Sequence, residues 1–105
     1  MENKYKIIIE KFAQRDLINI YEYISKTLFN EHAAIKLLNK ISDQFELIQF
    51  FPHSAPLINN PYIENKNIRK LSVDNYVIFY EVDDIMKEIK IIRIIHRRMN
   101  FLEVL

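Results

Sequence analysis

The chain has 105 residues, 50% of them hydrophobic, and its 15 lysines and arginines nearly balance 14 aspartates and glutamates, giving a net charge of +1. This length predicts one small domain over residues 1–105, and the near-neutral charge means that any basic function must come from a local patch. The absence of cysteine excludes disulfides and thiolate metal sites. No stretch resembles a secretion signal or a membrane span, so we expect a cytoplasmic protein without a membrane partner.

The first half of the chain shows one strand pattern and two helical patterns. Residues 5–10 are rich in isoleucine and predict a short strand. Apolar residues then recur at spacings of three and four, as in helices that bury one face. The first stripe is Leu17, Ile20, Tyr21, Ile24 and Leu28, and the second is Ala34, Leu37 or Leu38, Ile41, Phe45 and Ile48. A break at Asn30 and a stop before Phe51-Pro52 predict an antiparallel helical hairpin.

The second half reads as a loop followed by three strands. Residues 52–67 hold all three prolines and predict the loop. Alternating apolar residues predict strands at 68–73, 76–83 and 88–96. Asp74-Asn75 predicts a tight turn, and because glycine is absent, turns that need a positive φ must use Asn or Asp. The order β-α-α-β-β-β predicts an α+β two-layer fold, with the N-terminal strand and helical hairpin packed on an antiparallel sheet.

Basic side chains gather at the end of the last predicted strand, where no acid lies between Glu88 and Glu103. Strict alternation gives one face Ile89, Ile91, Arg93, Ile95 and Arg97, and the other face Ile92, Ile94, His96 and Arg98. Arginine suits bidentate contacts with phosphate or carboxylate, and histidine exchanges protons near neutral pH. The cluster predicts a site for a phosphate backbone or an acidic protein surface, although each residue alone also fits a solvated strand end.

Other side chains admit two interpretations. Arg69 shares a strand face with Leu71 and Val73, so it either caps the edge of the core or points into a site. The apolar tail, which comprises Met99, Phe101, Leu102, Val104 and Leu105, either packs back on the core or marks a partner surface. The helical acids and remaining histidines are expected to be solvated, namely Asp16, Glu22, Asp43, Glu46, His32 and His53. They lack metal-ligand spacing, and no metal or other cofactor is expected.

Four segments, in this order, resemble RelE/ParE toxins of bacterial type II toxin–antitoxin modules. The segment Ala13-x-x-Asp16-Leu17-x-x-Ile20-Tyr21-x-Tyr23-Ile24 resembles their first helix, and Phe51-Pro52 resembles the loop after their second helix. The segment Arg69-x-Leu71-x-Val73-x-x-Tyr76-x-Ile78-x-Tyr80 resembles their central hairpin. Residues 91–100, IIRIIHRRMN, resemble the last strand, especially of ParE-like members, where an isoleucine- or leucine-His-x-Arg ending is common.

The resemblance implies a toxin that arrests growth when it is free of an antitoxin encoded beside it. Antitoxins of this type wrap an extended or helical segment over the toxin, so the apolar tail and the basic strand end are expected docking points for an acidic, apolar peptide. The residues implied to bind a partner or a nucleic acid are Arg69, Arg93, His96, Arg97, Arg98 and Phe101. Both a homodimer and a heterotetramer with the antitoxin stay open.

Within this family the resemblance implies two activities. ParE-like members poison DNA gyrase by binding, and the His-x-Arg-Met-Asn ending and modest charge favour this target. RelE-like members cut messenger RNA on the ribosome, and in that alternative Arg69, His96 and Arg97 would supply the catalytic groups. The near-neutral charge and the lack of a C-terminal tyrosine, where Phe101 and Leu102 stand instead, count against cleavage. A second alternative is an inactive family member.

Overall fold

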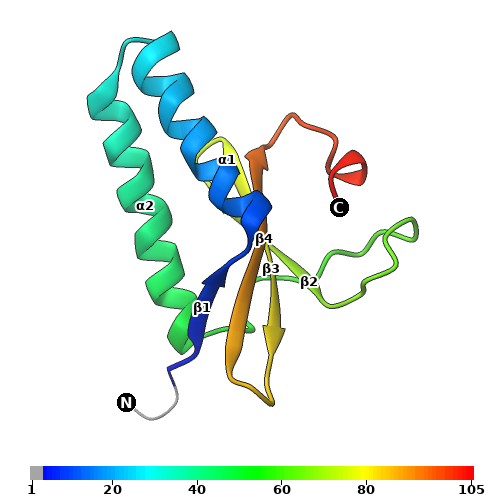
Figure 1. The fold of residues 1–105 in the computed structure, drawn as a ribbon. Helices are drawn as coiled ribbons and strands as arrows, with labels where there is room; N and C mark the ends of the chain where they lie inside the picture. Colours follow the sequence, from blue (N-terminus) through cyan, green and yellow to red (C-terminus); the bar gives the residue numbers. More distant parts are fainter. Residues whose placement is uncertain (1–3) are drawn as a thin grey trace.

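The computed structural model describes residues 4–105 and arranges them as one sheet with a helical hairpin against it (Figure 1). The helical part consists of α1 (Lys11–Glu22), a π-helical turn η1 (Tyr23–Thr27) and α2 (Glu31–Phe50). The sheet consists of β1 (Lys6–Ile9), β2 (Ile68–Val73), β3 (Tyr76–Asp83) and β4 (Glu88–His96), and a 3-10 turn η2 (Phe101–Glu103) lies in the tail. No helix within residues 4–105 combines the length and apolar character that crossing a membrane requires.

The strand order of the sheet is β1-β4-β3-β2. Strand β3 pairs antiparallel with both β2 and β4, which confirms the predicted three-strand meander. Strand β1, which was predicted to pack on an antiparallel sheet, instead joins the edge of that sheet parallel to β4, so the sheet is mixed. The predicted α+β fold is therefore confirmed, and β4 occupies a central position that brings its C-terminal end beside the helical hairpin (Figure 1).

The hairpin covers one face of the sheet with its predicted apolar stripes. The buried cluster between the two layers contains Ala13, Ile20, Leu37, Ile41, Ile48, Ile78, Tyr80, Ile89, Ile91 and Ile94. Leu37, rather than Leu38, is the buried member of the second stripe. The sequence also places Leu28 in the first stripe, which is wrong because Leu28 is 53% exposed. It follows the π-helical turn, and the wider turn rotates it away from the stripe.

The opposite face of the sheet is covered by the loop of residues 52–67 and by the C-terminal tail, which approach each other in Figure 1. A second buried cluster, Ile63, Ile68, Phe79 and Ile95, lies there, and Phe101, Val104 and Leu105 pack against it. The Phe101 ring lies 5.5 Å from the ring of Phe79. The tail thus takes the first of its two interpretations at three positions, while Met99 and Leu102 stay 49% and 41% exposed.

A β-bulge interrupts the pairing of β3 with β4 near the middle of both strands. Phe79 lies opposite Arg93, whereas the next residue of β3, Tyr80, lies opposite Ile91. Ile92 is therefore the extra residue of β4, and an extra residue shifts every later side chain relative to strict alternation.

The bulge overturns the predicted faces of β4. Ile89, Ile91 and Ile94 belong to the helix-side cluster, while Ile92 and Ile95 pack on the opposite face. The predicted shared face of Ile95 with Ile89 and Ile91 is therefore wrong. The predicted separation of Arg93 from His96 is also wrong, because both side chains line one pocket.

Among residues 4–105, three take a positive φ, which this glycine-free chain was expected to reserve for Asn and Asp. Asp74, in the β2–β3 turn, confirms the prediction with a φ of 52°. Phe29 and Lys87 have φ values of 52° and 55° and contradict it. Both lie in short connections between paired elements, where the geometry of the connection sets the dihedral against a modest steric cost. The predicted break at Asn30 is the N-cap of α2, whose side chain accepts a hydrogen bond from the Ala33 N–H at 3.0 Å.

Candidate functional site

A pocket of about 470 Å³ lies where the C-terminal half of α1 meets the end of β4. Its walls include Asp16, Asn19, Tyr23, Tyr76, His96 and Met99. Burial raises the pKa of Tyr76, and the nearby Tyr23 hydroxyl adds to the shift. We call this end of the sheet the open end and define it by Tyr23, Tyr76, His96, Arg97 and Arg98.

An ion pair between Asp16 and Arg93 holds α1 against β4 at the base of this pocket. The Arg93 Nε and Nη2 atoms donate to the two Asp16 carboxylate oxygens at 2.8 and 2.9 Å, and the Ile94 N–H donates to the same carboxylate at 2.9 Å. The hydrogen bonds from Arg93 to Asp16, together with the carboxylate charge, raise the pKa of Arg93. Asp16 was expected to be solvated, which is wrong because it is only 9% exposed. It lies three residues after Ala13 and four before Ile20, so it shares their buried helix face.

The ring of His96 is fixed by two contacts. It packs edge-on against the Tyr76 ring, with centroids 5.3 Å apart and planes inclined by 77°. Its Nδ1 atom accepts a hydrogen bond from the Arg98 N–H at 3.2 Å. A neutral ring whose Nδ1 accepts carries its hydrogen on Nε2, so His96 offers an N–H donor on its other side.

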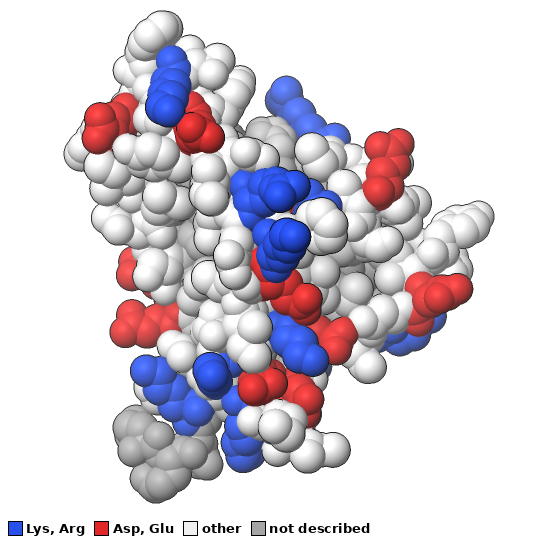
Figure 2. All heavy atoms as spheres, in the orientation of Figure 1, with Lys and Arg blue, Asp and Glu red and all other residues white. Residues whose placement is uncertain are grey.

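Arginine and lysine side chains gather around the open end. Arg97 and Arg98 follow His96 in the turn after β4, and Lys11 and Arg15 lie on α1, all four exposed. Within residues 4–105 none of these four forms an ion pair. Figure 2 shows basic side chains over the first turns of α1 and beside the end of β4, whereas both signs of charge mix at the opposite end of the sheet. The open end therefore carries local positive charge on a nearly neutral protein.

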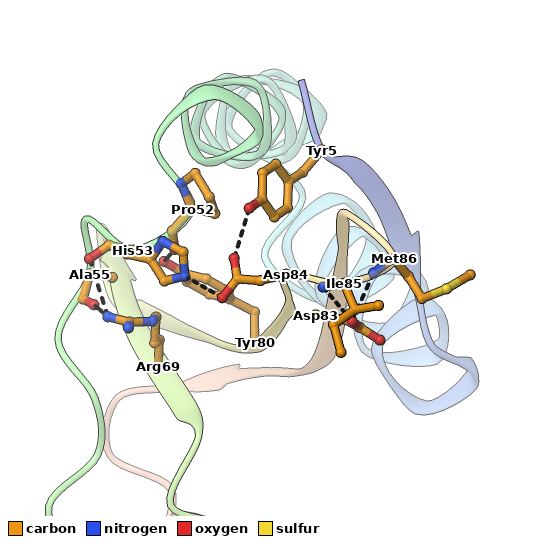
Figure 3. A network of polar contacts seen from close by, with 10 residues as sticks. All are labelled: Tyr5, Pro52, His53, Ala55, Arg69, Tyr80, Asp83, Asp84, Ile85 and Met86. Carbon is orange, nitrogen blue, oxygen red and sulfur yellow. Dashed lines mark hydrogen bonds and ion pairs between the residues drawn. The ribbon is translucent and has the colours of Figure 1, made fainter. Parts of the chain in front are cut away.

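The opposite end of the sheet carries similar residue types in a closed network (Figure 3). The Tyr5 hydroxyl donates to Asp84 at 2.7 Å, and His53 Nε2 lies 3.1 Å from the other oxygen of the same carboxylate. The hydrogen bond from Tyr5 lowers the pKa of Asp84, with a further contribution from His53, and the same bond raises the pKa of Tyr5. We call this end the turn end and define it by Tyr5, His53, Arg69, Tyr80 and Asp84.

Arg69 and Tyr80 bind the backbone of the α2–β2 loop at the turn end. Arg69 Nη1 donates to the carbonyl oxygens of His53 and Ala55 at 3.1 and 2.7 Å. The buried Tyr80 hydroxyl donates to the Pro52 carbonyl at 2.9 Å, and burial raises the pKa of Tyr80. These three bonds tie the loop to β2 and β3 and hold Arg69 at the edge of the core. Arg69 also lines a small pocket there, of about 130 Å³, together with His53 and Asp84.

The structure brings some of the sequence-predicted site residues together and separates others. Arg93 and His96 line the open-end pocket, and Arg97 and Arg98 lie in the turn between His96 and Met99, which also lines it. Arg69 of β2 pairs with Tyr80 of β3, whereas His96 of β4 pairs with Tyr76 of β3. The two pairing positions on β3 are four residues apart. That offset corresponds to about 13 Å along β3. Phe101 lies on the outer face of the sheet, against Phe79.

Sequence reasoning missed three pocket residues, namely Asn19, Tyr23 and Tyr76, and it named Met99 only as part of the apolar tail. Tyr23 and Tyr76 stood within the segments that carry the family resemblance, and that was the only signal for them. His53 was expected to be an ordinary exposed histidine, and its side chain is 48% exposed but paired with Asp84. No group of three His, Asp or Glu side chains among residues 4–105 is arranged to hold a metal ion.

Comparisons with known proteins agree with this fold. The family model described as the ParE toxin of type II toxin–antitoxin system, parDE, matches residues 7–101. The chromosomal ParDE toxin–antitoxin system from P. aeruginosa is similar, with a TM-score of 0.69, 23% identity, and coverage of 90% of this chain and 97% of that one. The toxin–antitoxin complex RelBE2 from Mycobacterium tuberculosis has a TM-score of 0.60, 18% identity and coverage of 90% and 99%. No curated protein matches.

Proposed function

We propose a function from the premise that this chain belongs to the ParE toxin family of type II toxin–antitoxin systems. In this proposal the protein arrests growth by binding DNA gyrase in the cytoplasm when it is free of its antitoxin. The surface assigned to this contact is the open end of the sheet. There, exposed Arg97 and Arg98 follow His96, which lines a pocket with aromatic walls. A binding toxin needs such a surface and needs no catalytic groups of its own.

The separation of Arg69 from the end of β4 carries this proposal. Ribonuclease chemistry needs a base, a cation and an acid around one phosphate, within hydrogen-bond reach of the reacting atoms. Arg69 lies about 13 Å along the sheet from the position of His96. Its guanidinium donates to the loop carbonyls of His53 and Ala55. The three residues that a nuclease was expected to combine therefore do not surround one point.

Purified DNA gyrase tests the proposal directly. Increasing amounts of the folded protein should abolish supercoiling of relaxed plasmid, and the double variant Arg97→Glu/Arg98→Glu should inhibit at least about tenfold more weakly because an attractive rim becomes repulsive. Full supercoiling in the presence of excess folded wild-type protein would sink the gyrase assignment.

One arrangement favours a second candidate, a ribosome-dependent endoribonuclease. His96 offers a hydrogen-bond donor at Nε2, and Arg97 and Arg98 follow it directly, so a proton-transfer group and two phosphate-binding groups are adjacent. This candidate predicts cleaved messenger RNA in translating extracts, lost in His96→Ala and Arg97→Ala. Intact transcripts at doses that stop growth eliminate it, and normal growth on expression without a partner would point to an inactive family member.

The tail that the resemblance offered as an antitoxin docking point packs on the sheet through Phe101, Val104 and Leu105. The antitoxin is therefore proposed to cover the outer side of the helical hairpin instead. A shallow apolar depression there is lined by Leu17, Ile18, Tyr21 and Leu38. Ile18 is 59% exposed on this surface. Apolar surface of this kind on a helix pair suits an amphipathic helix from a partner. Ile18→Glu should weaken co-purification with the product of the adjacent gene, whereas Tyr62→Glu, on the far loop, should not.

A further inference from the structure

The open-end pocket differs from the charged rim beside it in what its walls can bind. Tyr23, Tyr76 and Met99 give it aromatic and thioether surface, and Ile94 and Ile95 complete the apolar part. Tyr23 is 52% exposed and Met99 is 49% exposed, so this apolar surface is reachable from solvent. Partly exposed apolar walls of this kind suit a side chain inserted from outside.

The acidic group in the pocket does not repel a negatively charged ligand. Both Asp16 oxygens accept hydrogen bonds from Arg93, and one of them also accepts from the Ile94 N–H. The carboxylate is therefore neutralised by an adjacent guanidinium at 2.8 Å and has little capacity left for a cation. The charge that a ligand meets at the rim comes instead from exposed Arg97 and Arg98.

Hydrogen-bond donors line the pocket in addition to that charge. Asn19, Tyr23 and Tyr76 make no side-chain hydrogen bond to any other residue in the range 4–105, and His96 has Nε2–H available because its Nδ1 accepts from Arg98. The two tyrosine hydroxyls, the His96 N–H and the Asn19 amide can each donate a hydrogen bond. Four donors on apolar walls suit the carboxylate or carbonyl oxygens around an inserted apolar side chain.

We infer that the open-end pocket anchors an aromatic or large aliphatic side chain of an acidic segment of the protein target, with the flanking carboxylates on Arg97 and Arg98. The identity of that target as gyrase rests on the proposed function, whereas the chemistry of the segment rests on the pocket. An anchor in a pocket surrounded by charge-complementary contacts is the usual energetic arrangement of a protein interface.

A peptide fits this surface better than a nucleic acid does. In proteins that bind single-stranded nucleic acid, the bases stack on aromatic side chains along a positively charged groove. Here the Tyr76 and His96 rings meet edge to face at 77°, so the pair does not form a parallel stacking platform. The net charge of +1 also provides little of the long-range attraction that phosphate backbones require.

The test uses the isotopically labelled full chain and synthetic probes, followed by NMR. The probe is an eight-residue capped peptide with one phenylalanine among glutamates. Matched probes replace the glutamates by lysine, or the phenylalanine by serine, and a fourth probe is a single-stranded RNA octamer. The acidic aromatic peptide should shift the resonances of Tyr23, Tyr76 and His96 and bind at least about tenfold more tightly than each other probe. Tyr23→Glu should abolish these shifts, and Tyr62→Glu, at an 83% exposed position elsewhere, should keep them.

Several results overturn the inference. The inference fails if the acidic peptide leaves the pocket resonances unmoved, or if the lysine or serine peptide binds equally well. It also fails if the RNA binds more tightly at the same residues. Pocket resonances that shift with protein concentration in the absence of any probe would overturn it too, because they would mean that a second copy of the chain fills the pocket.

Gyrase then separates this inference from the proposed function. Gyrase inhibition that is unchanged in Tyr23→Glu overturns the pocket as the target contact and leaves the proposed function standing. A wild-type protein that binds the acidic peptide in the pocket but leaves gyrase active supports the pocket chemistry and overturns the gyrase assignment alone.

Discussion

The two ends of the sheet carry almost the same residue types and use them in different ways. At the turn end, His53, Asp84 and Tyr5 bind one another, while Arg69 and Tyr80 bind loop carbonyls (Figure 3). At the open end, Arg97 and Arg98 are exposed, and neither forms an ion pair within residues 4–105. The types of residue present therefore do not distinguish the structural cluster from the proposed binding surface. The fraction of their donors and acceptors that is already used does distinguish them.

The open end depends on one buried interaction for its position, the pair of Asp16 with Arg93. Removing one member of a buried pair leaves the other charge without compensation. Mutation can therefore test first whether this buried pair contributes more to stability than an exposed ion pair does.

The largest expected effect on stability is that of Asp16→Ala. It leaves the guanidinium of Arg93, 19% exposed, without its carboxylate and should lower the free energy of unfolding by about 3 kcal/mol. Glu22→Ala, which breaks the exposed pair with Lys26, should cost less than about 0.5 kcal/mol. Urea unfolding of both variants measures the difference, and equal losses would contradict the buried-anchor account.

The next effect compares arginines at the two ends. Arg69→Met removes two hydrogen bonds to loop carbonyls and should cost about 2 kcal/mol, because both bonds have a charged donor. Arg97→Met changes an exposed side chain and should stay within about 0.5 kcal/mol of the wild type. If urea unfolding shows that Arg97→Met is the more destabilising change, the assignment of roles to the two ends is reversed.

A smaller effect compares two tyrosine hydroxyls on β3. Tyr80→Phe leaves the buried Pro52 carbonyl without its donor and should cost about 1 kcal/mol. Tyr76→Phe removes a hydroxyl that makes no hydrogen bond within residues 4–105, so thermal unfolding should change little. The pair is matched in size and strand, and the reverse order of melting temperatures would refute the comparison.

The smallest effect concerns pH and the turn end. The folded-state pKa of Asp84 lies below its ordinary value of 3.8, chiefly because of the hydrogen bond from Tyr5. A carboxylate with a lowered pKa contributes stability above the unfolded value and loses it as pH falls through the folded value. The stability difference between the wild type and Asp84→Asn should therefore shrink in urea titrations as pH is lowered from 5 toward about 3. A difference that is constant over this range would show that Asp84 is not coupled to the fold.

Much of the fold was predictable because it follows from local periodicity. The second helical stripe, through Ala34, Leu37, Ile41 and Ile48, is buried as predicted. The three-strand meander also formed as the alternation of its residues predicted. Helix and strand periods act over a few residues, so the sequence displays them directly.

The bulge in β4 could not be predicted, and it reorganises the candidate site. No residue type marks the extra Ile92, since the bulge arises from the pairing of β4 with β3 rather than from β4 alone. The contact that it helps to place, from Arg93 to Asp16, joins residues 77 positions apart. A hint was present in the spacing of Asp16 from Ala13 and Ile20, because an acid on a buried helix face requires a partner.

The position of Arg69 at the turn end could likewise be predicted only in part. Its alternation with Leu71 and Val73 gave the correct face of β2 but not the end of the sheet or the bonding partner. The loop that supplies those partners, through His53 and Ala55, has no periodicity from which its path could be read.

The central claim is that the open end contacts the target while the turn end only holds the fold, and inhibition of gyrase supercoiling by two charge-matched variants tests it most directly. Arg97→Glu/Arg98→Glu and Lys66→Glu/Lys70→Glu lower the net charge equally, the first at the open end and the second at exposed positions on β2 and the loop before it. The account predicts that the first variant inhibits at least about tenfold more weakly than the second, with both folded. Equal inhibition by the two variants would contradict it.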